Sequence, residues 1–98
     1  MDLKDELTIA LRKPLVTAKG EVQSLALREP TAGELDKFTR AIARDGGVSA
    51  TLLLINLITG IDKPFLEKLG ARDFNAASEY LGAFMNASPE TGETPSQT

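Results

Sequence analysis

Apolar and polar side chains alternate over the first third of the chain in the way that half-buried β-strands do. The stretch LTIAL at 7–11 alternates with a period of two, and the leucines of LALR at 25–28 share one side. Between them, AKGE at 18–21 contains a glycine that suits a tight turn. The pattern therefore predicts a β-hairpin over residues 7–28.

Two residues disturb this alternation. Pro14 has no amide hydrogen to donate, so we expect the first strand to end there or to lie at a sheet edge. Val22 is out of phase by one residue with the leucines that follow it. A bulge near Gln23 and Ser24 would restore the phase, because a bulge inserts an extra residue into a strand.

The stretch REPTAGEL lies where the strand period gives way to a helical period. Pro30 favours extended geometry in the residue before it, which ends the strand. Thr31 and Glu34 form the T-x-x-E pattern of a capping box, and Leu35 is placed to pack on Pro30 as a hydrophobic staple. These residues predict the start of a helix. Arg28 either pairs with a nearby acid or faces a partner, and the sequence leaves both open.

Beyond this corner, the spacing of apolar residues predicts three to four short helices, separated by turns that contain glycine or a capping residue. Ser49 and Asp62 are the expected N-caps of the second and third helices, since both side chains can accept from a free backbone amide. The four helices are expected at about 31–44, 49–59, 63–69 and 72–85.

The composition changes near the end of the chain. Residues 86–98 are polar, contain two prolines and have no aliphatic side chain larger than alanine. Such a segment buries too little surface to offset the entropy of ordering it, so the sequence predicts a disordered tail. We therefore expect one α+β domain over residues 1–85, in which the hairpin is followed by the helices.

The predicted second helix is apolar on every side. Six of the seven residues at 52–58 are large and aliphatic. A helix of this kind must be enclosed, and a domain of this size has difficulty enclosing it alone. We therefore predict that part of this helix contacts another subunit or a partner. The candidate partner-binding residues are three on this helix and two outside it: Leu53, Ile55, Leu57, Phe65 and Arg28.

Composition argues against several classes of function. The chain has 98 residues with 14 acids and 11 bases, so it lacks the basic excess that is typical of nucleic-acid binding. It contains no histidine or cysteine, and these side chains perform most proton transfer, nucleophilic attack and transition-metal binding. We therefore expect a binding protein without catalytic residues, cofactor or metal.

The sequence also predicts no contact with a membrane. Its longest apolar stretch, LLLINLITGI, is about ten residues long, whereas a bilayer span takes roughly 20. The N-terminal stretch MDLKDEL is acidic and polar, unlike a signal peptide. We expect the protein in the cytoplasm.

Four stretches carry a resemblance to a known family. They are ALRKPL at 10–15, LALREPTAGEL at 25–35, LINLITGID at 54–62 and FLEKLGARDFNAASEYLGAF at 65–84. With them, the chain resembles the tail assembly chaperones of contractile-tailed (Mu-like and P2-like) bacteriophages over roughly 7–85. Glu34 stands where the family often has aspartate, and either acid suits a first helical turn.

The resemblance implies a chaperone encoded by a phage or prophage. Such proteins bind the long, aggregation-prone tape-measure protein until tail-tube subunits polymerise around it, and they are absent from the mature virion. Many also exist in a longer form, made by ribosomal frameshifting, that is thought to recruit tail-tube protein. The spare apolar helix surface suits both tape-measure binding and self-association. The alternative is a small structural or regulatory oligomeric subunit of the particle, which would be present in purified tails.

Overall fold

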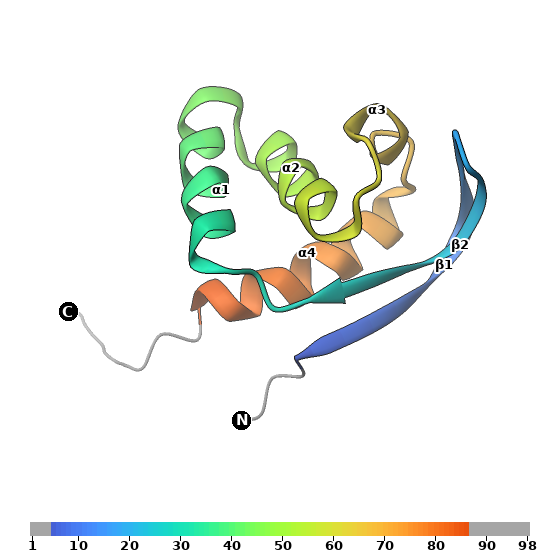
Figure 1. Cartoon of the computed structure of the whole chain (residues 1–98), viewed down its shortest axis with the longest axis horizontal. Helices are drawn as coiled ribbons and strands as arrows, with labels where there is room; N and C mark the ends of the chain where they lie inside the picture. Colours follow the sequence, from blue (N-terminus) through green and yellow to red (C-terminus); the bar gives the residue numbers. More distant parts are fainter. Residues whose placement is uncertain (1–4, 87–98) are drawn as a thin grey trace.

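The computed structural model of the chain describes residues 5–86, with the side chains described as far as Phe84. The predicted disordered tail therefore lies outside the described residues, except for Asn86. An antiparallel hairpin is followed by four helices, which confirms the predicted α+β class (Figure 1). The elements are β1 (Glu6–Thr17), β2 (Gly20–Arg28), α1 (Ala32–Asp45), α2 (Gly47–Thr59), α3 (Lys63–Leu66) and α4 (Ala71–Asn86).

A two-residue turn joins β1 to β2. The hydroxyl of Thr17 donates to the carbonyl oxygen of Gly20 at 2.9 Å, and Gly20 has a φ of 117°, which side chains on L-residues rarely allow. Further along the ladder, Leu7 lies opposite Leu27. The two strands thus present one apolar face to the helices.

The predicted bulge exists, but it lies on the other strand. Ala10 pairs with Ser24, and the next pair is Leu15 with Val22. Four residues of β1 therefore face a single residue of β2, so the extra residues belong to β1. Pro14 falls within this irregular segment, where no ladder bond is required of it, and β1 continues past it to Thr17.

The helices pack into a layer against the hairpin. Only Gly46 separates α1 from α2, and α4 runs along the base of the layer beside the hairpin (Figure 1). A single core lies between the hairpin and the helices. Its buried apolar residues are Leu15, Leu25, Leu27, Phe38, Ala41, Ala50, Leu52, Leu54, Ile55, Leu66, Ala77 and Leu81.

Two of the predicted helix starts differ from the structure. Ser49 is not the cap of α2: the helix begins after Gly46, and Ser49 lies within it and accepts a hydrogen bond from Lys63. Asp62 does precede α3, but its side chain makes no capping hydrogen bond, and its backbone carbonyl accepts from Phe65 instead. Helix α3 ends at Leu66 rather than near 69, because the chain then turns towards α4.

Candidate functional site

Helix α2 is only partly enclosed by the rest of the chain. Leu52, Leu54 and Ile55 are buried in the core. Leu53 and Leu57 are half-buried, and their spacing of four residues places both on one face of the helix. The fold therefore leaves an apolar strip along α2 partly uncovered, as the all-round apolar sequence predicts. We call Leu53 and Leu57 the α2 strip.

Ile55 does not belong to this surface. Its exposed fraction is 0%, and it is among the largest fully buried side chains of the core. A residue in that position cannot contact a partner without opening the domain. The prediction that Ile55 binds a partner is therefore wrong for this fold, because the sequence pattern gives every side of α2 the same apolar character.

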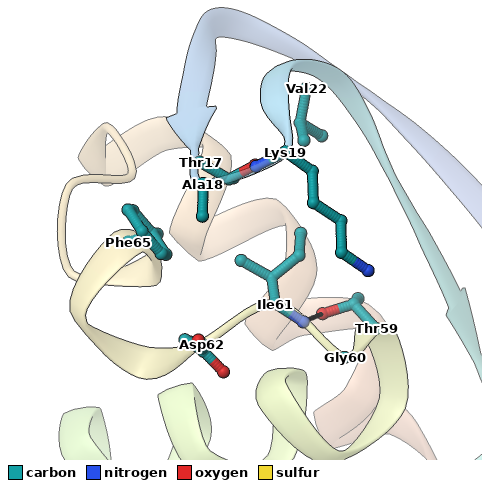
Figure 2. Close-up of a pocket in the computed structure, with 9 residues that line it drawn as sticks. All are labelled: Thr17, Ala18, Lys19, Val22, Thr59, Gly60, Ile61, Asp62 and Phe65. Carbon is teal, nitrogen blue, oxygen red and sulfur yellow. Dashed lines mark hydrogen bonds between the residues drawn. The ribbon is translucent and has the colours of Figure 1, made fainter.

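Phe65 lies in a separate groove between the tip of the hairpin and the segment that links α2 to α3. Figure 2 shows Phe65, Ala18 and Ile61 bordering the same space. The groove has a volume of about 190 Å³, which suits one or two apolar side chains better than a drug-sized ligand. The full lining is Thr17, Ala18, Lys19, Val22, Thr59, Gly60, Ile61, Asp62 and Phe65.

The groove is bounded by fixed backbone on the helical side. Gly60 has a φ of 81° and ends α2, with its amide donating to the Asn56 carbonyl. The Thr59 hydroxyl accepts from the Ile61 amide at 3.2 Å, and the Asn56 side chain donates to the Ile61 carbonyl (Figure 2 draws the first of these bonds). Neither Leu53 nor Leu57 is among the residues that line the groove around Phe65, so the α2 strip is not part of it.

A buried carboxylate lies at the bulge of β1, and the sequence did not predict it. Asp73, near the start of α4, is only 3% exposed. Its carboxylate accepts the Arg12 amide at 3.0 and 3.1 Å and the Lys13 amide at 3.2 Å. These amides belong to the irregular segment of β1 and have lost their ladder partners. The carboxylate of Asp73 therefore holds α4 to the hairpin.

The corner that precedes α1 is as the sequence predicts. The Thr31 hydroxyl accepts the Glu34 amide at 3.2 Å, and the Glu34 carboxylate accepts the Thr31 amide at 2.9 Å, which completes the capping box. Pro30 is buried and Leu35 is half-buried, as a hydrophobic staple requires.

Arg28 is paired within the same corner. Its two terminal nitrogens donate to the two carboxylate oxygens of Glu34, each at 2.8 Å. The Arg28 side chain is 39% exposed and that of Glu34 is 16% exposed. Of the two possibilities left open for Arg28, pairing with a nearby acid is the one that the structure contains.

Comparison with known families identifies the family to which the chain belongs. Residues 8–86 match a family model described as "Phage tail assembly chaperone proteins, E, or 41 or 14". The chain belongs to this family. The match covers most of the chain and confirms the resemblance that the four stretches carry. Comparisons with curated proteins and with solved structures gave no significant match.

Two further observations concern membrane spans and metal-type clusters in the described part of the chaperone. Over residues 5–86, none of the helices combines the length and apolarity that crossing a bilayer would need. Over the same residues, the structure brings together no group of three side chains of the types that hold metal ions.

The corner of the chaperone gives a pH-dependent prediction. The hydrogen bonds from Arg28 lower the pKa of Glu34 from 4.5 to about 2. A lowered folded-state pKa stabilises the protein fully above pH 4.5, and this stabilisation is lost as the pH falls towards 2. We expect Glu34→Gln to reduce the free energy of unfolding by about 1–2 kcal/mol at pH 7, since the cap and a partly exposed ion pair are weakened together.

Urea unfolding of both proteins across this pH range measures the effect. The difference between wild type and Glu34→Gln should shrink as the pH falls below about 4.5, because the Glu34 carboxylate of the unfolded wild-type chain then becomes protonated, whereas the folded chain keeps the charge until the pH nears 2. Glu67→Gln, at an exposed position after α3, serves as the control and should change little. A difference that stays constant between pH 7 and pH 2 would contradict the assignment.

Proposed function

We propose that this tail assembly chaperone binds the tape-measure protein and keeps it soluble while the tail assembles. Membership of the family supports the general role. The observation that carries the finer proposal is the α2 strip, where Leu53 and Leu57 stay half-buried on one helix face. A long helical protein with apolar stripes can pack a stripe along such a face by side-chain ridges at the same spacing.

The groove around Phe65 supports the same proposal. It lies at the other end of α2 from the connection to α1, and it accepts an apolar side chain from a bound segment. The lining contains one basic residue, Lys19, and one acidic residue, Asp62, so apolar contact rather than charge selects the ligand there. A tape-measure segment bound at both the α2 strip and the groove would bury apolar side chains at two places.

We extend the proposal to the assembly sequence. A longer frameshifted form of the chaperone recruits tail-tube subunits to the covered tape measure, and both forms act in the host cell and leave before the virion is complete. The coding sequence for residues 86–98 tests the first part, since frameshifting requires a slippery run there. Mass spectrometry of purified tails tests the second, and a stoichiometric amount of this chain in them would favour a structural subunit.

Co-expression with the tape-measure protein tests the binding proposal. We expect the double variant Leu53→Glu with Leu57→Glu to remain folded, because both side chains are partly in water already. The tape-measure protein should then become as insoluble as it is without the chaperone, since two buried carboxylates oppose apolar contact strongly. The measurement is the soluble fraction of tape-measure protein, with circular dichroism of the purified variant.

The matched control carries the same change of charge elsewhere. Ile42 and Val48 are exposed apolar residues on α1 and α2, and Ile42→Glu with Val48→Glu also adds two negative charges. This control should leave the tape-measure protein soluble. Equal loss of solubility with both double variants, or a folded strip variant that still solubilises the tape measure, would remove the α2 strip from the proposal.

A further inference from the structure

Among residues 5–86, β2 is the only strand that pairs with β1, so the first half of β1 has an open edge within the described part of the chain. Glu29 donates its backbone amide to the carbonyl oxygen of Asp5 at 2.9 Å, which fixes the hydrogen-bonded pairs of the ladder. Hydrogen-bonded and non-bonded pairs alternate in an antiparallel sheet, so the odd-numbered residues at this end of β1 bond to β2. The even-numbered residues direct their backbone groups away from β2, and all three have exposed side chains: Glu6, Thr8 and Ala10.

The same part of β1 has an incompletely covered apolar face. Ile9 is half-buried, although Leu25 opposite it is 1% exposed. Leu7 is likewise half-buried, although Leu27 opposite it is buried. The helical layer therefore covers the β2 side of the hairpin more fully than the β1 side, and Figure 1 shows β1 along the outer margin. Apolar surface on β1 remains available next to the open edge.

The open edge also has a sequence that complements itself. The stretch is ELTIALR, residues 6–12, and Ile9 is its centre. An antiparallel strand of the same sequence, centred on Ile9, would place Glu6 opposite Arg12 and Leu7 opposite Leu11. Two opposite-charge pairs then lie on the exposed face and three apolar pairs on the half-buried face. Cross-strand pairs of these kinds are the ones that stabilise sheets.

We propose that two copies of the chaperone pair through this edge of β1, antiparallel and centred on Ile9, to form a four-stranded sheet across a two-fold axis. In this register, Thr8 of one copy lies opposite Ala10 of the other, and the backbone groups of both residues point away from β2. The two residues can therefore form a hydrogen-bonded pair. The contact is isologous and closes on itself, so it gives a dimer rather than a fibre. It does not depend on tape-measure binding.

The structure also limits the contact to this stretch. The amides of Arg12 and Lys13 are already taken by the Asp73 carboxylate, and Pro14 has no amide to offer. The mutual backbone hydrogen bonds between the copies are therefore those of Thr8 and Ala10, and Arg12 meets Glu6 of the second copy through its side chain. Sheet proteins commonly use such bulges and prolines to stop pairing along an edge. Here the bulge and Pro14 end the pairing at Arg12, which lies opposite Glu6, the first residue of β1 in the second copy.

Charge exchange at the two ends of the stretch tests the register. We expect Glu6→Arg or Arg12→Glu alone to raise the dimer dissociation constant at least about fivefold at low salt, since each places like charges opposite one another twice. The double variant, with both exchanges, should restore the wild-type constant. Sedimentation equilibrium measures these constants, and the differences should diminish in high salt.

Asp36 and Arg40 provide matched controls, because they form an exposed ion pair on α1 with the same signs of charge. Asp36→Arg and Arg40→Glu change the net charge of the chain equally and should leave the dimer unaffected. A wild-type chain that stays monomeric up to its solubility limit would overturn the proposal. A double exchange that fails to restore pairing would overturn it too, as would equal weakening by the α1 exchanges.

Disulfide trapping measures the register directly. The chain has no cysteine, so single-cysteine variants carry one thiol each. A mixture of Thr8→Cys and Ala10→Cys proteins should form the mixed disulfide in preference to either homodimer, because these residues face each other in the proposed pairing. A mixture of Ala10→Cys with Ala26→Cys, on β2, is the control. Equal cross-linking in both mixtures would contradict the pairing.

Discussion

Replacing Asp73 with alanine is expected to reduce the free energy of unfolding by about 3 kcal/mol, which is a large part of the stability of a domain of this size. The change removes the acceptor of two backbone amides at the bulge, from Arg12 and Lys13. Both amides lie in a segment without ladder partners, so no other acceptor in the described chain replaces the carboxylate. Urea unfolding followed by circular dichroism gives the magnitude.

A graded variant keeps this prediction testable if the alanine protein does not fold. Asp73→Asn preserves the shape and one oxygen, but it turns an amide group towards backbone donors, so we expect a loss of about 1–2 kcal/mol. Hydrogen exchange at Arg12 and Lys13 should accelerate in both variants. Asp45→Ala, which breaks an exposed ion pair with Arg44, is the control and should cost under about 0.5 kcal/mol. Equal effects at Asp45 and Asp73 would contradict the role of the buried carboxylate.

Parts of this fold could be predicted from the sequence because they depend on interactions between residues that are close together in the chain. The Thr31–Glu34 capping box and the turn before Gly20 involve residues within three positions of each other, so the sequence contains every group that decides them. The hairpin and the helices follow from apolar periods of the same short range. The α+β class could therefore be predicted without knowledge of how the elements pack.

The features that the sequence did not reveal depend on long-range contacts. Asp73 lies 61 positions from Arg12, and nothing in its own surroundings in the sequence indicates that it receives strand amides. The phase change at Val22 shows that the strands are irregular but not which one contains the extra residues, because pairing register is a property of both strands. Ser49 can cap a helix, but Lys63 binds its hydroxyl from another element.

For the predicted partner-binding residues too, the sequence indicated one property and left another, which depends on packing, undetermined. The sequence predicts that α2 has more apolar surface than a small domain can enclose, and Leu53 and Leu57 are only half-buried in the structure. It could not show which side of α2 faces inwards, since the periodicity of an all-round apolar helix carries no direction. Ile55 was for that reason placed on the wrong side.

Truncation of α2 residues should separate folding from binding. We expect Ile55→Ala to reduce the free energy of unfolding by about 2–5 kcal/mol, since the fully buried side chain leaves a cavity in the core. Leu54→Ala, at a second fully buried position, should fall in the same range. Leu57→Ala should cost about 1 kcal/mol or less, because the side chain is only half-buried and water can fill the space that it leaves.

The same three proteins then distinguish two ways of losing chaperone activity. At a temperature where each variant is still folded, Ile55→Ala and Leu54→Ala should solubilise the tape-measure protein as wild type does, because the α2 strip is intact. Leu57→Ala should solubilise it less well despite its greater stability, since it removes half of the strip. A chaperone activity that follows the free energy of unfolding across all three, with Leu57→Ala nearest to wild type, would show that stability alone governs the assay and would contradict a binding role for the strip.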